Sequence, residues 1–222
     1  MKNTLTSAPV APLLARLFAD AKRSQGLVSE LFGQFSPEER AARMSDPNAD
    51  YRAFYGRAKD IHMPVSAETG SLLYLLARGN GARAIVEYGT SFGISTLHLA
   101  AALRDNGGGK LIGSEFEPSK LAHARANLES AGLSDLVEIR EGDALETLAR
   151  DLPPSIDLVL LDGHKALYAK ILALVAPYLR PGSFLVADNA DACPDYKAQV
   201  RAPDSGYLSL PFRDDVELTV QL

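Results

Sequence analysis

The feature that most constrains the fold is a change of hydrophobic pattern near residue 84. From there onward, short apolar runs alternate with segments in which apolar residues recur at helical spacing. This alternation is typical of successive β-α-β units that build a parallel sheet. It predicts strands over residues 84–88, 110–115, 136–140, 156–161 and 183–187.

Two of these strands are predicted to be central. Residues 156–161 and 184–187 are almost continuously apolar, as expected where helices cover both faces of a sheet. The end of the chain differs, because apolar and polar residues alternate strictly over 216–222. Together with a run at 207–210, that pattern predicts a closing antiparallel pair with one buried face.

The segment before the sheet is predicted to be helical. Ser36 precedes a proline and two glutamates, which is typical of a helix start, and a further helix is expected over 66–78. We interpret residues 1–62 as a helical cap and residues 63–222 as a cofactor-binding and catalytic α/β core. The whole of 1–222 is treated as a single domain, because no linker, repeat or low-complexity tract divides it.

Composition favours a chain that acts on small molecules. The 222 residues are 46% hydrophobic, which is enough to bury a sizeable core, and the formal charge of -5 offers no attraction for nucleic acid or an anionic membrane. No apolar run is long enough to span a bilayer. Cys193 is the only cysteine, so no intramolecular disulfide can form, and a reducing cytoplasm is the expected location.

A glycine-containing turn is the first candidate for ligand binding. Gly89 and Gly93 follow a predicted strand and precede a helical pattern, where backbone can approach a ligand and helix N–H groups are free. Glu115 ends the next strand, where a carboxylate can accept both hydroxyls of a ribose. The pairing indicates an adenosine-type ligand, although a plain strand-to-helix turn also explains the glycines. Ser91 replaces the middle glycine of the dinucleotide motif, which disfavours NAD and FAD.

Carboxylates at two further strand ends form the second candidate. Asp162 ends the fourth predicted strand, and Asp188 with Asn189 ends the fifth. Neighbouring parallel strands place such ends side by side at the edge where ligands bind, and these oxygen donors suit a hard cation such as magnesium. The alternative is a polar strand end and a turn. Lys165, three residues after Asp162, is placed to act as a base beside such a cation.

Five segments in order carry a family resemblance that runs from about Met63 to the C-terminus. They are VEYGTSFGIST (86–96), GSEFEP (113–118), REGDA (140–144), LLDGHKALY (161–168) and RPGSFLVADN (180–189). In these motifs the chain resembles the class I S-adenosylmethionine-dependent O-methyltransferases of the catechol and caffeoyl-CoA type. The resemblance implies a Rossmann-like fold with a seven-stranded, mostly parallel sheet and an antiparallel last strand.

The resemblance also implies roles for individual residues. The cofactor-binding positions would be Met63, Val65, Glu87, Gly89, Ser91, Gly93, Ser95, Glu115, Asp143, Ala144, Asp162 and His164. Within that set, Glu115 would bind the ribose, and Ala144 and His164 would flank the adenine. Asp162, Asp188 and Asn189 would hold a divalent metal, and Lys165 would be the catalytic base acting with Asp162.

We therefore expect an S-adenosylmethionine-dependent O-methyltransferase that acts on a hydroxyl of a small, aromatic, catechol-like acceptor with the help of magnesium. Three alternatives stay open at this point. They are a metal-independent methyltransferase on the same fold, a catalytically silent cofactor-binding protein and, more remotely, a nicotinamide oxidoreductase. Apolar positions on the N-terminal helices also leave a homodimer open.

Overall fold

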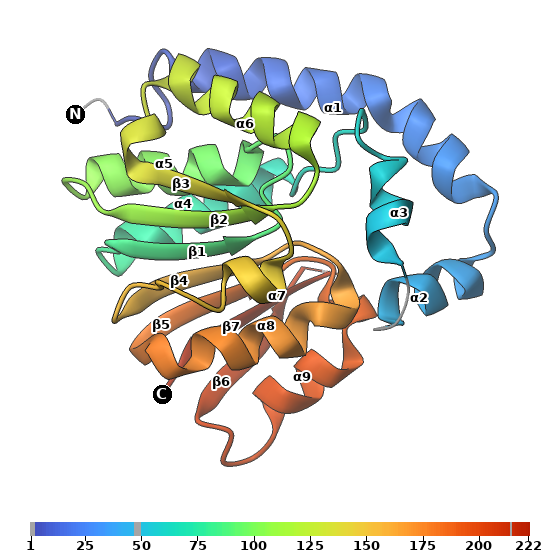
Figure 1. Cartoon of the computed structure of the whole chain (residues 1–222). Coiled ribbons are helices and arrows are strands. Elements are labelled where there is room, and N and C mark those ends of the chain that lie inside the picture. The colour runs from blue at the N-terminus through green and yellow to red at the C-terminus, as the bar shows by residue number, and fades with distance from the viewer. Residues whose placement is uncertain (1–2, 47–49, 214) are drawn as a thin grey trace.

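In the part of the chain that the computed structural model describes, residues 3–46, 50–213 and 215–222, seven strands form one sheet with helices on both faces (Figure 1). The strands are β1 (Ala84–Tyr88), β2 (Lys110–Glu115), β3 (Val137–Glu141), β4 (Ile156–Leu161), β5 (Leu179–Ala187), β6 (Tyr207–Phe212) and β7 (Val216–Gln221). Their spatial order is β3-β2-β1-β4-β5-β7-β6. The first five are parallel, and β7 pairs antiparallel with both β5 and β6.

The predicted fold class is confirmed, and two strand boundaries need correction. The strand predicted over 136–140 is β3 at 137–141, because residues 134–136 form a 3-10 turn before it. The strand predicted over 183–187 begins earlier, at Leu179, because Leu179 pairs with Ile156 across an irregularity in the β4–β5 register. Pro181 and Gly182 in this stretch give it the sequence of a turn.

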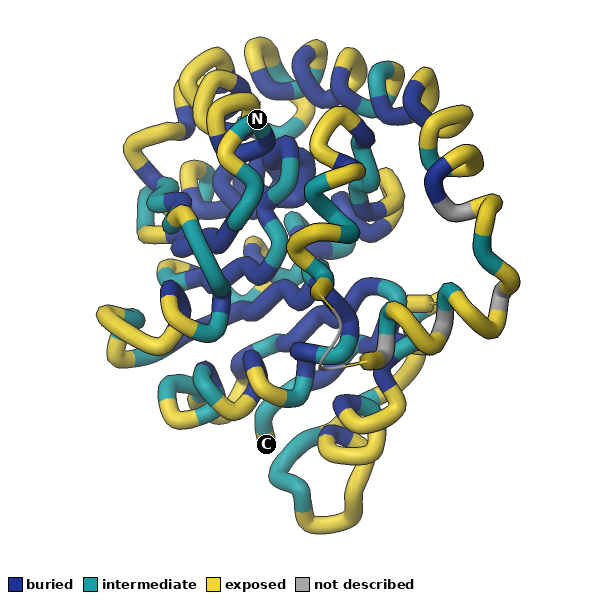
Figure 2. The backbone as a smooth tube through the Cα atoms, turned by 45° about the vertical axis from the view of Figure 1, so that its right-hand side comes forward, coloured by how far each residue is buried: buried dark blue, intermediate teal, exposed yellow. Residues whose placement is uncertain are grey.

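Two apolar layers sandwich the sheet. Alternate residues of the central strands face opposite sides: Ile85 packs with the helices of one layer, while Val86 and Tyr88 pack with those of the other. Figure 2 shows the buried backbone concentrated in the sheet and on the inner sides of the helices. The helices are α1 (Val10–Gly33), α2 (Pro37–Ser45), α3 (Tyr51–Gly56), α4 (Ala67–Gly79), α5 (Ile94–Asp105), α6 (Pro118–Ala131), α7 (Ala144–Thr147), α8 (Tyr168–Val175) and α9 (Pro194–Arg201).

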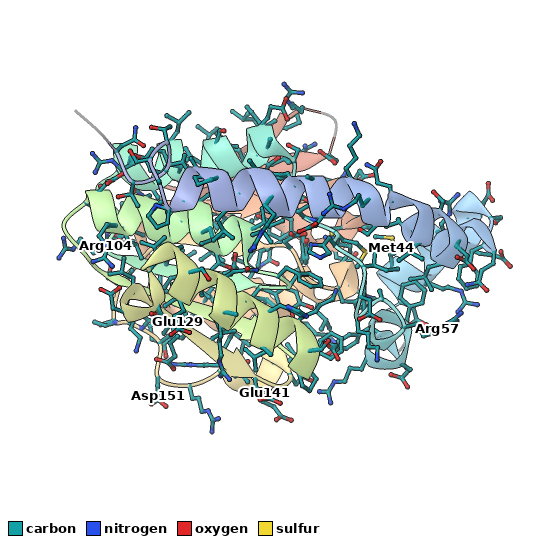
Figure 3. The ribbon with its side chains drawn as sticks, turned by 90° about the horizontal axis from the view of Figure 1, so that it is seen from above. Met44, Arg57, Arg104, Glu129, Glu141 and Asp151 are labelled. Atoms are coloured by element: carbon teal, nitrogen blue, oxygen red, sulfur yellow. The ribbon has the colours of Figure 1, made fainter. Side chains whose placement is uncertain are left out.

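The N-terminal helices reach over the edge of the sheet where the parallel strands end. The first half of α1 packs on α5 and α6, and its second half runs past the strand ends toward α2 and α3 (Figure 1). Figure 3, seen from above, places Arg57 at the opposite end of the molecule from Arg104, with Met44 between the middle of the molecule and Arg57. Ser36 caps α2 as predicted: it accepts the Glu39 N–H at 3.2 Å, and the Glu39 carboxylate accepts the Ser36 N–H at 2.8 Å.

None of the helices in the described residues is both long and apolar enough to cross a bilayer.

Asp157 links β1, β4 and β5 by hydrogen bonds at the edge of the sheet where the parallel strands begin. It lies in β4, where Oδ2 accepts the N–H groups of Arg83 at 2.7 Å and Ala84 at 3.0 Å. Oδ1 accepts Nε of Arg180 from β5 at 3.1 Å. Burial acts to raise the pKa of Asp157, but these donors outweigh it and the pKa is lowered.

We expect Asp157→Asn to lower the free energy of unfolding by about 1.5–3 kcal/mol at neutral pH, because charge-assisted hydrogen bonds from three residues lose their anionic acceptor. Since the folded-state pKa is depressed, this stabilisation is present above the unfolded-state pKa of about 3.9 and disappears as pH falls through the folded-state value. Urea unfolding at neutral pH and near pH 3 measures it.

Asp135→Asn is the matched control for that experiment. Asp135 also pairs with an arginine, Arg104, but its side chain is 60% exposed. Its loss is expected to cost at most about 0.5 kcal/mol. Equal costs for the two variants, or a cost for Asp157→Asn that does not change with pH, would contradict the role given to Asp157.

Candidate functional site

A cavity of about 830 Å³ opens where β1, β2, β4 and β5 end. The strand ends contribute Gly89, Glu115, Asp162 and Asp188, and α2 and α3 contribute an opposite wall that includes Met44 and Tyr55. A smaller hollow adjoins this cavity at the glycine-containing turn. Among the predicted residues, its lining includes Met63, Val65, Gly89, Ser91, Ser95 and Asp162.

Glu87 lies beneath this turn and lines neither space. Its fully buried carboxylate accepts the hydroxyls of Ser95 at 2.6 Å, Thr96 at 2.6 Å and Thr90 at 3.0 Å. Burial raises the pKa of Glu87, and the three hydroxyls lower it in part. In this geometry Glu87 holds the turn and the start of α5 in place.

The two glycines of the turn serve different contacts. Gly89 has φ +98°, and a Cβ there would lie 2.5 Å from the carbonyl oxygen of Asp162. The turn and the end of β4 therefore touch through backbone, and only glycine fits between them. Gly93, with φ +83°, caps α5 and faces Ala124 of α6, where a Cβ would meet the Ala124 Cβ at 3.4 Å. It lines neither the cavity nor the hollow.

Glu115 faces the cavity from the end of β2. Its Oε2 accepts the Ser91 N–H at 2.7 Å, and Oε1 accepts the Glu117 N–H at 2.9 Å. Burial raises the pKa of Glu115, and these backbone donors lower it in part. An ionised carboxylate has about four acceptor positions, so it can still receive the two hydroxyls of a ribose.

Aromatic rings line the cavity on the side of His164. The His164 ring stacks on Tyr51 of α3 at 4.9 Å with an interplanar angle of 11°, and its backbone N–H donates to the Tyr88 hydroxyl at 2.9 Å. Ala144 also lines this side. Asp143 does not, because one carboxylate oxygen caps α7 through the Leu145 N–H and the other pairs with Arg52 of α3.

Lys165, Asp162 and Asp188 converge where β4 and β5 end, and all three line the cavity. Lys165 Nζ lies 3.3 Å from Asp162 Oδ1 and donates to the Tyr168 hydroxyl at 2.8 Å. The Tyr168 hydroxyl in turn donates to the backbone oxygen of Asp188 at 2.8 Å. The lysine side chain is thus fixed against both strand ends by buried hydrogen bonds.

Two buried carboxyl groups lie close together in this cluster, and their ionised forms are disfavoured. Burial raises the pKa of Asp162 to about 6, against the lowering effect of Lys165. Burial raises the pKa of Asp188 to about 7, with repulsion from Asp162 as the next cause. Buried carboxylates with one ammonium among them form a site that favours an additional cation.

Asn189 follows Asp188 with φ +52° and lines the same cavity. Its amide donates to Asp215 at 3.4 Å. Asp162, Asp188 and Asn189 therefore present oxygen donors of the type that a hard cation prefers. Within residues 3–46, 50–213 and 215–222, however, no three His, Cys, Asp or Glu side chains are grouped as metal ligands.

Comparison of the chain with known proteins identifies its family. Residues 86–190 match the family model described as a methyltransferase domain. A putative O-methyltransferase from Mycobacteroides abscessus is 30% identical over 175 residues, which span 78% of this chain and 76% of that protein. The chain belongs to the class I O-methyltransferase family.

Two further proteins are similar to this chain, one in sequence and one in structure. A catechol O-methyltransferase from Niastella koreensis is 37% identical over 128 residues, or 56% of this chain. That match spans 57%, little more than half, of the length of the catechol enzyme. The crystal structure of the O-methyltransferase TomG from Streptomyces achromogenes, solved with S-adenosylmethionine, is 27% identical with a TM-score of 0.58. It covers 88% of this chain and 94% of that one.

Three residues at this candidate site were not predicted from sequence. Tyr168 follows Lys165 by three positions, a spacing that places two side chains on one helical face and that would have indicated the pair. Tyr51 lies on a short helix far from the motifs in sequence, so no local pattern points to it. Lys120 also lines the cavity, one turn into α6 after Glu115.

Proposed function

We propose that this O-methyltransferase transfers the methyl group of S-adenosylmethionine to a hydroxyl oxygen of a small, aromatic, catechol-like acceptor. The observation that carries the proposal is a single cavity that contains the Gly89 turn, Glu115 and the cluster of Asp162, Lys165 and Asp188. One group of residues can hold an adenosyl cofactor, and the other can prepare an oxygen nucleophile beside it.

The cofactor would lie across the ends of β1 and β2. Glu115 would accept the ribose hydroxyls, and the aromatic side with His164 and Ala144 would receive the adenine. Met63, Val65 and Ser95 line the small hollow at the turn, and the amino-acid tail would lie in the main cavity next to it. Glu87 and Gly93 would act indirectly, by holding the turn and the start of α5.

The chemistry is an in-line displacement at the methyl carbon. The acceptor oxygen forms a bond to carbon as the bond from carbon to sulfur breaks, and S-adenosylhomocysteine leaves. The hydroxyl proton must go to a base, and Lys165 Nζ is the buried amine that lines the cavity next to Asp162. Its two fixed contacts, to Asp162 and Tyr168, limit it to one orientation, which favours a near-attack geometry.

Asp162, Asp188 and Asn189 would hold a magnesium ion or a similar divalent cation. When bound, such an ion lowers the pKa of a coordinated hydroxyl and neutralises the carboxylates around it. The support is the donor chemistry and the raised pKa values of Asp162 and Asp188, because a bound cation would favour the ionised carboxylates. A small-molecule acceptor, a homodimer and a cytoplasmic location remain predictions.

The test is a methyl-transfer assay with catechol, S-adenosylmethionine and magnesium, with product identified by mass spectrometry. We expect a methylated catechol, loss of turnover in EDTA and recovery on added magnesium. Asp188→Asn should raise the magnesium concentration needed, whereas Asp195→Asn on the exposed side of α9 should not. Turnover that persists in EDTA would favour the metal-independent reading.

Cofactor binding without product from any acceptor would support a catalytically silent protein instead. Calorimetry with S-adenosylhomocysteine and a thermal-shift comparison with NAD separate these outcomes, because ligand binding to the native state raises the melting temperature. Stabilisation by NAD and not by S-adenosylhomocysteine would overturn the proposal altogether.

A further inference from the structure

Three basic side chains surround one aromatic ring beside the glycine-containing turn. Phe92 follows Ser91, and the His62 ring stacks on it at 3.7 Å with an interplanar angle of 11°. His123 lies 5.5 Å from the Phe92 ring, and Lys120 Nζ lies 5.7 Å from its centroid. We call His62, Lys120 and His123 the basic cluster. Lys120 and His62 also line the main cavity. An ammonium at a ligand cavity is a suitable partner for an anionic group of the ligand.

Lys120 is the strongest member of the basic cluster. It is 5% exposed and lines the main cavity. Burial lowers the pKa of Lys120, and the carboxylates of Glu115, Glu117, Asp162 and Asp60 act in the opposite direction. Yet in the described part of the chain no carboxylate is within salt-bridge distance of Nζ, and Nζ has no hydrogen-bond acceptor. An ammonium that lines a cavity without a protein acceptor can bind acceptor atoms of a ligand there.

His62 provides a second nitrogen without a partner. Its Nδ1 is buried and has no hydrogen-bond partner among the described residues. His62 lines both the main cavity and the hollow at the turn, so it stands where the two spaces meet. Lys120 therefore lines the main cavity together with Glu115, and His62 connects that cavity with the hollow lined by Val65 and Ser95.

The position of the basic cluster selects its ligand. The sheet order β2-β1-β4-β5 places α6, which follows β2, on the opposite side of the Gly89 turn from Lys165 and Asp188. An acceptor oxygen must be near Lys165, so an anion near Lys120 belongs to the cofactor. The only anionic group of S-adenosylmethionine is the carboxylate of its amino-acid tail.

We infer that Lys120, assisted by His62, binds the carboxylate of the cofactor's amino-acid tail. This inference rests on the proposed function, because it takes S-adenosylmethionine as the cofactor. It adds an ion pair from α6 to a tail that backbone groups of the turn would otherwise hold. The ammonium would be desolvated by the cavity walls, which strengthens the pair relative to one at the surface.

The test compares two ligands that differ by that carboxylate. Calorimetry measures the affinity of wild type and Lys120→Met for S-adenosylmethionine and for decarboxylated S-adenosylmethionine. We expect Lys120→Met to weaken S-adenosylmethionine about 10- to 100-fold, the range for a charge-assisted hydrogen bond. Affinity for the decarboxylated ligand should not fall, because it has no carboxylate for Lys120 to bind and carries only positive charge.

Three further variants keep the result interpretable. Lys170→Met, an exposed lysine on α8, should alter neither affinity. Lys120→Arg should retain most of the preference for the carboxylated ligand, because it keeps the charge. His62→Phe preserves the stack on Phe92 but removes the nitrogen, so we expect a loss for S-adenosylmethionine of about 2- to 10-fold.

Other results of these measurements would contradict the inference, and each would contradict a different step of it. Equal weakening of both ligands by Lys120→Met would show that Lys120 supports the shape of the cavity and does not bind the carboxylate. A change confined to the KM of the acceptor would assign the basic cluster to the acceptor. If wild type binds neither S-adenosylmethionine nor S-adenosylhomocysteine, the proposed function itself is wrong.

Discussion

Lys165→Met is expected to lower kcat for methyl transfer by about 10²- to 10⁴-fold, the usual contribution of a positioned general base. Methionine has a similar length and suits a site where the side chain is only 5% exposed. The substitution removes the amine that lies 3.3 Å from Asp162 and donates to Tyr168. Initial rates at saturating cofactor and acceptor measure the change directly.

Two controls separate a chemical role of Lys165 from a structural one. Removing Lys165 leaves Asp162 without its ammonium partner, so stability must be followed by thermal unfolding with and without S-adenosylhomocysteine. Lys170→Met, on the exposed side of the next helix, should keep wild-type kcat. A Lys165→Met protein that turns over at the wild-type rate would remove Lys165 from the reaction. If Lys165→Met lowers cofactor affinity and kcat by the same factor, Lys165 supports the structure of the site and is not the base.

The fold was predictable because it depends on the period of the hydrophobic pattern. Continuous apolar runs identified β4 and β5, and alternation identified the antiparallel pair β6–β7. The N-terminal extension of β5 was missed because Pro181 and Gly182 form no local strand pattern. That segment is a strand because Leu179 meets Ile156 across the sheet, which is a tertiary contact.

The candidate site was predictable only where topology determines position. Asp162 and Asp188 had to meet because they end neighbouring parallel strands. Which way a side chain points depends on contacts that sequence spacing does not encode. Asp143 turns to Arg52, a residue of α3 that is distant in sequence, and Glu87 turns beneath the turn to three hydroxyls. The roles of both in cofactor binding remain predictions.

Gly89→Ala is expected to weaken S-adenosylhomocysteine binding more than about 100-fold, equivalent to about 2.7 kcal/mol. Gly89 has a left-handed φ of +98°, and its added Cβ would lie 2.5 Å from the carbonyl oxygen of Asp162 and 2.8 Å from the amide nitrogen of Gly163. Both obstacles are backbone, so relief requires that the turn and the end of β4 move apart. That movement would displace the surface on which the cofactor is proposed to lie, together with Asp162.

Gly81→Ala isolates the contact from the backbone conformation. Gly81 also has a left-handed φ, +66°, but an added Cβ there would meet nothing within 4 Å. Gly81→Ala should therefore cost about 1–2 kcal/mol of stability and leave S-adenosylhomocysteine affinity unchanged. Calorimetry and urea unfolding of both variants provide the comparison. If the two substitutions weaken the ligand equally, conformational strain alone explains the loss, and the close approach of Gly89 to Asp162 has no part in building the site. If only Gly89→Ala does so, the turn and the end of β4 must be in contact for the cofactor to bind, which is why the sequence has a residue without a side chain there.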